Sequence, residues 1–158
     1  MTIGSLPTGT MPHLSLPATS GEASIDLGSG ALGDYVLFIY PRTGRPDRPE
    51  SAEWAGVPGA KGCTAESCEF RDLAGDFLRV GFRIIGLSSQ DTEYQREAVD
   101  RLHLPYPLLS DPGFRLADEL GLDTFEFEGE RLYSRATLVV RNGVIDEAHV
   151  DIEDPRTH

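Results

Sequence analysis

The feature of this sequence that most restricts its fold is a continuous apolar run from Asp34 to Tyr40, DYVLFIY. The run is rich in β-branched and aromatic residues, which favour strands. A strand with one face in water alternates apolar and polar residues, whereas a continuous run is typical of a strand buried on both faces. The run therefore predicts the centre of a sheet that is covered on both sides.

Strand and helix patterns alternate along the rest of the chain. Apolar residues at helical spacing predict helices at residues 64–80, 91–102 and 114–120, the last ending at Gly121. Strands are predicted at 83–88 and 106–109, and hairpins at 13–27, 124–133 and 136–150, the last turning at Arg141-Asn142-Gly143. We expect an α/β fold with a mixed central β-sheet, flanking helices and an N-terminal hairpin.

Length and composition favour a single domain over residues 1–158. The 158 residues match one domain of about 150 residues, and no repeat or linker divides them. Residues 1–12 and 151–158 are expected to be loose ends. Residues 41–62 are rich in proline and glycine and predict a long loop, which in a compact domain is often functional.

The charge of the chain restricts its partners and its location. Fourteen basic and 26 acidic residues give a net charge of -12, which repels phosphate backbones and anionic lipid headgroups. We therefore expect neither nucleic-acid nor membrane partners. No apolar stretch approaches the roughly 20 residues of a membrane span, and no export signal is recognisable at the N-terminus. These observations favour a cytoplasmic protein.

The chain has only two cysteines, Cys63 and Cys68. Since the cytoplasm keeps structural thiols reduced, a close pair there is more often catalytic, redox-sensing or metal-binding than a structural disulfide. A structural zinc site needs about four ligands. The four histidines have no ligand spacing; they are His13, His103, His149 and His158. We expect no metal and no cofactor, and the spacing is not that of the Cys-x-x-Cys dithiol motif.

Cys63 lies where the long loop meets the helix predicted at residues 64–80. The unpaired N–H groups and the macrodipole of a helix N-terminus favour an anion, so a thiol there ionises more easily. A free thiol, with a pKa of about 8.5, is only about 3% thiolate at pH 7. A thiolate attacks peroxide and becomes a sulfenic acid, which a second thiol can convert to a disulfide. The alternatives are an inert buried thiol at Cys63 and a core cysteine at Cys68.

The distance between the two thiols adds a condition. Five residues apart in a continuous helix, the two Cα atoms lie about 8.7 Å from each other. A disulfide needs a Cα separation of roughly 4.4 to 6.8 Å. We therefore predict that the first turns of this helix unwind whenever Cys63 and Cys68 become bonded.

Several short motifs occur in order along the chain. They are Tyr40-Pro41, Gly62-Cys63-Thr64, Cys68, Phe70-Arg71-Asp72, Gly86-Leu87-Ser88, Pro107-Leu108-Leu109-Ser110-Asp111-Pro112 and Arg135-Ala136-Thr137-Leu138-Val139-Val140. In this order and spacing they resemble the peroxiredoxins, in particular the atypical two-cysteine subgroup called peroxiredoxin Q or bacterioferritin comigratory protein. The resemblance covers about residues 13–150, nearly the whole chain.

The resemblance implies a thioredoxin-like fold and the reduction of hydrogen peroxide or organic hydroperoxides. It makes Cys63 the peroxidatic cysteine and Cys68 the resolving one, with thioredoxin or a similar dithiol protein as reductant. It also implies that Arg135 steadies the thiolate and polarises the peroxide, as an always-charged guanidinium with several donors can do. The alternative for Arg135 is a surface ion pair. The subgroup implies a monomer, or a weak homodimer.

The sequence departs from the family pattern before Cys63. The family has a hydroxyl residue three positions before the nucleophile, and this chain has Ala60 there. An insertion of about 18 residues, 44–61, separates Cys63 from Pro41 and Thr43 at the end of the strand. We expect Thr43 to supply the hydroxyl, the alternative being an ordinary loop threonine. Trp54, inside the insertion, either covers the site, binds a partner or packs the loop onto the domain.

Three classes of function fit these residues. The first is a thioredoxin-dependent peroxidase with Cys63, Cys68, Arg135, Thr43 and Pro41 at its site. The second is a thiol redox sensor that is oxidised once without sustained turnover. The third is a binding domain that has lost turnover, because a fold alone does not fix a function.

Overall fold

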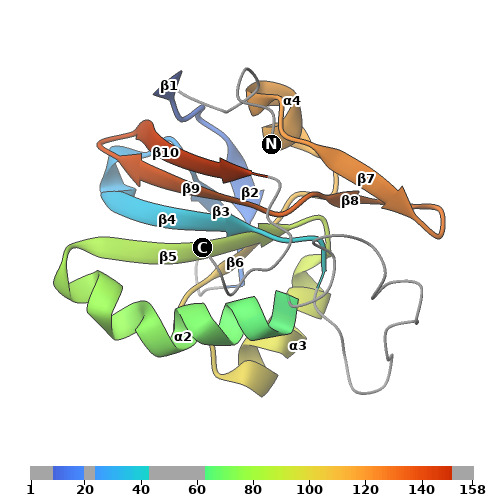
Figure 1. Cartoon of the computed structure of the whole chain (residues 1–158), viewed down its shortest axis with the longest axis horizontal. Helices are drawn as coiled ribbons and strands as arrows, with labels where there is room; N and C mark the ends of the chain where they lie inside the picture. The colour runs from blue at the N-terminus through green and yellow to red at the C-terminus, as the bar shows by residue number, and fades with distance from the viewer. Residues whose placement is uncertain (1–8, 20–23, 43–62, 151–158) are drawn as a thin grey trace.

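The computed structural model describes residues 9–19, 24–42 and 63–150. Its main element is a six-stranded sheet in the order β1-β10-β9-β4-β5-β6 (Figure 1). The strands are β1 (Gly9–Thr10), β4 (Asp34–Ile39), β5 (Phe82–Ser88), β6 (Leu108–Ser110), β9 (Ala136–Arg141) and β10 (Val144–Val150). The central strand β4 pairs parallel with β5 and antiparallel with β9, so the sheet is mixed, as predicted.

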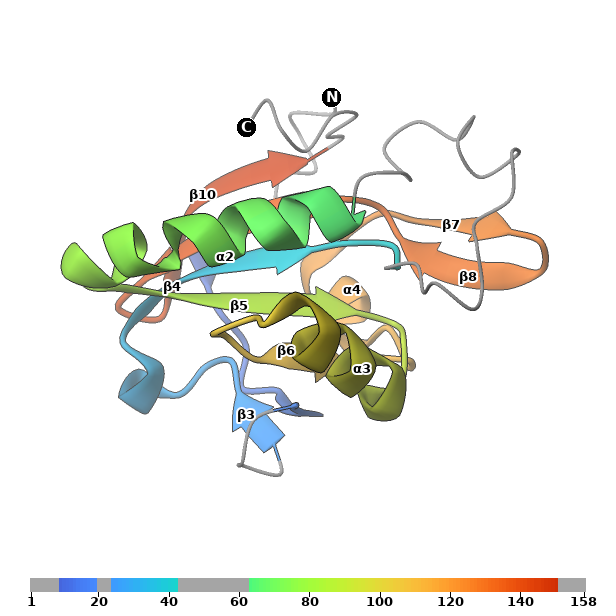
Figure 2. The same cartoon turned by 90° about the horizontal axis from the view of Figure 1, so that it is seen from below.

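Two layers cover this sheet, as the apolar run in β4 requires. On one face Phe38 and Ile84 pack with α2 (Cys63–Arg79) and α3 (Thr92–Leu102). On the other face Leu37 and Ile85 pack with α4 (Arg115–Leu120) and with the hairpin of β2 (Ser15–Pro17) and β3 (Ser24–Asp26). Figure 2 shows α2 and the β2–β3 hairpin on opposite sides of the sheet. Side chains therefore alternate between two cores along β4.

Helix α2 is held to the sheet by aromatic rings and by one close approach. The Phe70 ring stacks on Phe38 with 4.7 Å between centroids, and Phe77 lies 6.3 Å from Phe70. Under these rings β5 carries Gly86, where a Cβ atom would lie 2.8 Å from Phe38 Cζ and 2.5 Å from Leu108 Cδ2. A glycine at this position is therefore a packing requirement.

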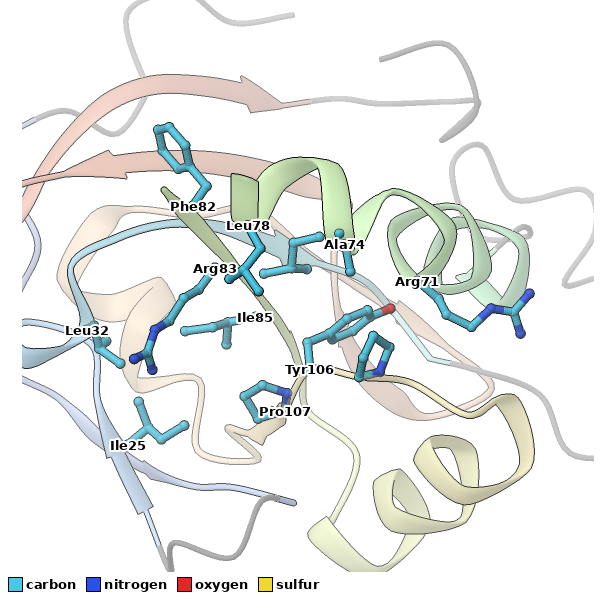
Figure 3. A pocket seen from close by; sticks show the side chains of 13 residues that line it. Ile25, Leu32, Arg71, Ala74, Leu78, Phe82, Arg83, Ile85, Tyr106 and Pro107 are labelled. Atoms are coloured by element: carbon cyan, nitrogen blue, oxygen red, sulfur yellow. The ribbon is translucent and has the colours of Figure 1, made fainter. Parts of the chain in front are cut away.

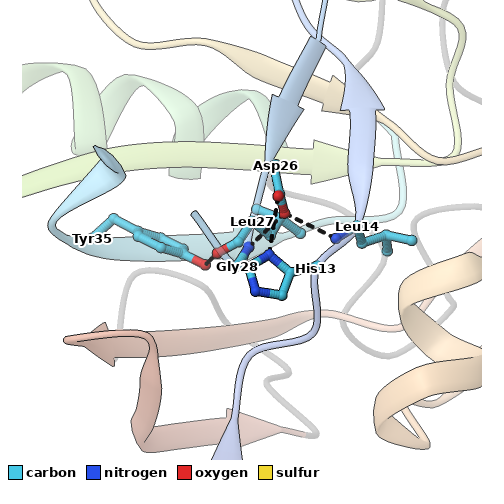
Figure 4. Close-up of polar contacts among 6 residues, drawn as sticks. All are labelled: His13, Leu14, Asp26, Leu27, Gly28 and Tyr35. Carbon is cyan, nitrogen blue, oxygen red and sulfur yellow. Dashed lines mark hydrogen bonds and ion pairs between the residues drawn. The ribbon is translucent and has the colours of Figure 1, made fainter. Parts of the chain in front are cut away.

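The N-terminal hairpin is fixed by the carboxylate of Asp26 (Figure 4). This carboxylate accepts hydrogen bonds from the N–H groups of Leu14 at 3.0 Å and Gly28 at 2.9 Å, and from His13 Nδ1 at 3.1 Å. The hydrogen bond with His13, followed by that from Gly28, lowers the pKa of Asp26. Nearby, Tyr35 donates to the Leu27 carbonyl at 2.7 Å and ties the hairpin to β4.

The predicted turns are confirmed where the sequence carries turn residues. Asn142 and Gly143, between β9 and β10, both have positive φ, as do Glu128 and Gly129 between β7 (Thr124–Phe127) and β8 (Glu130–Tyr133). This geometry matches two-residue hairpin turns. Asp91 caps α3 by accepting a hydrogen bond from the Tyr94 N–H at 2.7 Å.

Three boundaries differ from the prediction. Residues 9–12 are not a loose end, because β1 pairs with β10 and Met11 is buried in the core. The strand expected at 106–109 begins only at Leu108, since Pro107 has no N–H to extend the ladder. Helix α4 begins at Arg115, because Phe114 has a left-handed backbone with φ of 55°. Among the described residues, no helix has the length and apolar character needed to cross a membrane.

Candidate functional site

The candidate site lies at the carboxyl edge of β4 and β5. These strands are parallel, so the helix that connects them, α2, runs in the opposite direction and begins at their carboxyl ends (Figure 1). Cys63 is the first residue of this 17-residue helix. Its backbone therefore lies among the unpaired N–H groups at the positive end of the helix dipole. The predicted position of Cys63 at the start of a helix is confirmed.

The same edge carries Arg135 and Pro41. Ile39 of β4 pairs with Ala136 of β9, so the two residues that follow in opposite directions, Tyr40 and Arg135, lie side by side. Arg135 is only 2% exposed, and Pro41 is buried. The alternative of a surface ion pair for Arg135 is therefore wrong. Thr43, Trp54, Ala60 and the insertion 44–61 lie outside the described residues.

A buried network fixes the backbone just before Arg135. Tyr133, fully buried in β8, donates to Asp111 Oδ2 at 2.6 Å and accepts from the Ala117 N–H at 3.0 Å. Asp111 also accepts from the N–H groups of the first two residues of α4, both at 3.0 Å. Burial, followed by the hydrogen bond to Asp111, raises the pKa of Tyr133, so its hydroxyl stays a donor. The end of β8 is thereby fixed to the start of α4.

Cys68 lies in the second turn of α2, partly buried and with a free thiol. The carbonyl of its neighbour Ser67 accepts a hydrogen bond of 2.6 Å from Tyr106, whose ring lies edge-on to Phe38. Arg71, three residues after Cys68, has a raised pKa, first because of its 3.0 Å hydrogen bond to Asp72 and then because of Cys68. A cation therefore lies within electrostatic reach of the Cys68 thiol.

The helical backbone keeps the two cysteines apart. Residues 63–68 are helical throughout, so the estimated Cα separation of about 8.7 Å applies to this state. Cys68 does not lie in the core, which was the alternative, since its side chain is of intermediate exposure. The two cysteines therefore lie in the first two turns of one helix, at the sheet edge that also carries the buried Arg135.

A family model described as Redoxin matches residues 7–158. The chain belongs to the Redoxin family. Similar curated proteins include peroxiredoxin Q, chloroplastic, of Suaeda salsa, 34% identical over 151 residues that cover 95% of this chain and 63% of that protein. The putative peroxiredoxin Q, chloroplastic, of Oryza sativa subsp. indica is 29% identical over 161 residues, 96% of this chain and 73% of that protein.

Solved structures agree with this Redoxin assignment. The crystal structure of peroxidoxin BcpB from Mycobacterium tuberculosis has a TM-score of 0.72 at 28% identity, over 92% of this chain and 86% of that chain. Peroxiredoxin Q of Xanthomonas campestris, with a TM-score of 0.69 at 21% identity over 88% of this chain and 80% of that one, supports the fold alone. The thioredoxin-like fold and the peroxiredoxin resemblance are confirmed, and the chain is a peroxidase, an oxidoreductase.

Some contacts near the candidate site were not predicted from the sequence. Arg42, after Pro41, donates to Glu130 Oε1 at 2.9 Å and lies over the Phe127 ring at 5.5 Å. These contacts fix the end of the β4 strand to the β7–β8 hairpin. No local sequence pattern indicates the Arg42–Glu130 pair or the bond between Tyr133 and Asp111, because the partners are 88 and 22 residues apart in the sequence.

Proposed function

We propose that this chain reduces hydrogen peroxide or organic hydroperoxides with Cys63 as peroxidatic and Cys68 as resolving cysteine. The observation that carries the proposal is the place of Cys63 as the first residue of α2, at the sheet edge that also carries buried Arg135. The family membership supports the reaction class. The roles of the individual residues are inferred from their positions.

In the first step the Cys63 thiolate attacks one oxygen of the hydroperoxide. A sulfur–oxygen bond forms, the oxygen–oxygen bond breaks, and the leaving oxygen takes a proton to give water or an alcohol. The helix N-terminus and Arg135 stabilise the thiolate and the charge that develops on the leaving oxygen. Burial of Arg135 strengthens this effect, because water does not screen the guanidinium.

In the second step the Cys68 thiolate attacks the sulfur of the Cys63 sulfenic acid. A disulfide forms, the sulfur–oxygen bond breaks, and the leaving hydroxide takes a proton from solvent to give water. Because the helical Cα separation of about 8.7 Å exceeds the disulfide range, the first turns of α2 unwind in this step. The hydrogen bond from Tyr106 to the Ser67 carbonyl lies in the segment that must move.

Two further residues complete the proposed site. Pro41, buried after β4, shields the reacting sulfur from water. Thr43, two residues further, supplies the hydroxyl that Ala60 lacks; replacing Thr43 with valine is expected to slow the second-order reaction with peroxide. An unchanged rate would remove Thr43 from the proposal.

The proposal includes the partner that closes the cycle. Thioredoxin or a similar dithiol protein reduces the disulfide by thiol–disulfide exchange and becomes oxidised itself. We further propose that the protein acts in the cytoplasm, where such dithiols are kept reduced, as a monomer or weak homodimer and without metal or cofactor.

A coupled assay tests the proposal. Reduced protein is mixed with hydrogen peroxide, thioredoxin, thioredoxin reductase and NADPH, and the loss of NADPH is followed. We expect sustained turnover for the natural protein, none for Cys63→Ser, and one sulfenic acid per chain without thioredoxin turnover for Cys68→Ser. A single stoichiometric oxidation of the natural protein would instead indicate a redox sensor, and inert thiols would indicate a binding domain.

A further inference from the structure

A second candidate site lies away from the cysteines, where α2 faces the amino-terminal half of β5 (Figure 3). It is a cavity of about 510 Å³, within the range of roughly 300 to 1,000 Å³ of small-molecule sites. Its walls are mainly apolar and come from both faces of the sheet; they include Ile25, Leu32, Ala74, Leu78, Ile85 and Pro107.

The cavity exists because β6 covers only part of β5. Strand β6 pairs with Gly86–Ser88, so on this side no described strand pairs with β5 before Gly86. Gly86 donates to the Pro107 carbonyl on this side, whereas Leu87 accepts from the Tyr40 N–H on the β4 side. By strand alternation the N–H and carbonyl of Ile84 also point to the open side. If the β5–β6 ladder continued, the Ile84 carbonyl would accept a hydrogen bond from the N–H of residue 107, but Pro107 has no N–H.

Ile84 therefore offers the cavity a backbone donor and acceptor. Among the described residues, neither group has a hydrogen-bond partner. Ile84 itself lines the cavity and is only 4% exposed. A ligand group that accepts a hydrogen bond would pair with the Ile84 N–H, which is otherwise unpaired among the described residues.

One guanidinium at the cavity is available for an anion. Arg83 is exposed, and within the described part of the chain its side chain makes no hydrogen bond or ion pair. Figure 3 shows its side chain reaching from β5 toward Leu32 and Ile25. The other arginine, Arg71, points away and is engaged by Asp72 and by the Leu102 carbonyl at 2.8 Å.

We propose that this cavity binds an amphipathic monocarboxylate with an unbranched acyl chain. The carboxylate pairs with Arg83 and accepts from the open backbone edge, and the chain lies along Leu78, Ile85 and Pro107. The anionic head group is expected to bind at Arg83, because a chain with a net charge of -12 attracts an anion only through such a local guanidinium. The apolar walls fix the tail.

This site is separate from the peroxidase site. Leu78 lies 15 residues after Cys63 in α2, a displacement of about 22 Å along the helix axis at about 1.5 Å per residue. Binding therefore does not require either thiol. Cys63→Ser is expected to bind the carboxylate as the natural protein does, so the fate of this inference is independent of the proposed peroxidase mechanism.

The test is a titration of isotope-labelled, reduced protein with decanoate, followed by amide NMR shifts and calorimetry. We expect saturable one-to-one binding, with the largest shifts at residues 82–86, and weaker binding of decanol. Arg83→Gln should weaken decanoate binding by about tenfold or more, as expected for losing a charged hydrogen bond. Leu78→Ser, at a side chain 66% exposed, should weaken decanoate and decanol alike without unfolding the chain.

Arg79→Gln is the matched control. It removes the same charge from the end of α2, but Arg79 pairs with Asp76 at 2.6 Å and does not line the cavity. Its decanoate affinity should match that of the natural protein. Equal affinity for decanoate and decanol, or equal loss in Arg83→Gln and Arg79→Gln, would overturn the proposal. Absence of binding below millimolar concentration, or shifts only with an extended acidic peptide, would also overturn it.

Discussion

The two halves of α2 are held to the molecule in different ways. In the first two turns, which carry Cys63 and Cys68, Tyr106 donates a hydrogen bond to the carbonyl of the buried Ser67. Phe70 marks the boundary between the halves; its ring packs against Phe77 of the second half, which also borders the apolar cavity. Hydrogen bonds can be exchanged with water at a net cost of about 1 kcal/mol, whereas ring packing cannot be replaced in that way. One helix thus combines a segment that can open with an anchor that stays.

The largest effect is expected at the buried guanidinium of Arg135, at the sheet edge where α2 begins. Arg135→Met should lower the rate of Cys63 oxidation by peroxide by about 100-fold to 1,000-fold, the usual cost of losing a group that stabilises developing charge. Stopped-flow measurement of sulfenic acid formation checks this value, and Arg135→Lys should recover part of the rate. Near-natural oxidation by a folded Arg135→Met, judged by circular dichroism, would show that the guanidinium is not part of the chemistry.

The anchoring half should carry more of the stability than of the chemistry. Phe77→Ala should lower the free energy of unfolding by about 2 to 3 kcal/mol, just below the range for a fully buried ring, because Phe77 is partly buried. Urea unfolding measures this loss. The rate of peroxide reduction at a temperature where the variant is folded should stay within about twofold, and a large fall would mean that the two halves are not independent.

A change in the half of α2 that opens should alter the rate of disulfide formation. Tyr106→Phe removes the hydroxyl that holds the Ser67 carbonyl, so unwinding becomes easier by about 1 kcal/mol, or about fivefold in rate. Disulfide formation after oxidation, followed by quenched mass spectrometry, should therefore be faster while the Cys63 oxidation rate stays the same. A slower disulfide step in Tyr106→Phe would contradict the assignment of this bond to the closed state.

The smallest effect lies outside both halves, in the N-terminal hairpin. Because the pKa of Asp26 is lowered in the folded chain, its stabilising contribution is present above the ordinary value of 3.8. It is lost as the pH falls through the lowered pKa. Asp26→Asn should therefore flatten the acid limb of the unfolding free energy and leave the pH profile of peroxide reduction unchanged. A shifted activity profile would mean that the hairpin is coupled to the site.

The sequence predicted those features that depend on local chemistry. The apolar run gave β4, the helical spacing after Cys63 gave α2, and Asn142-Gly143 gave the last hairpin turn. These signals are strong because each element reports its own burial or backbone geometry.

The features that could not be predicted depend on contacts between distant segments. The burial of Arg135 beside Tyr40 follows from the register of β9 against β4, which no local pattern specifies. The bond between Tyr133 and Asp111 joins a hairpin to a helix start. The open edge at Ile84 follows from Pro107, whose effect is visible only once β6 is placed beside β5. The chemistry-bearing residues were thus recognisable, but not what holds them in place.

The most direct test of the account is amide hydrogen exchange over residues 63–70 in the reduced and the oxidised protein. The reduced protein should show helical protection there, and formation of the Cys63–Cys68 disulfide should remove it, while protection around Phe77 stays the same. Identical protection of residues 63–70 in both states would contradict the unwinding of α2, and with it the pairing of the two cysteines.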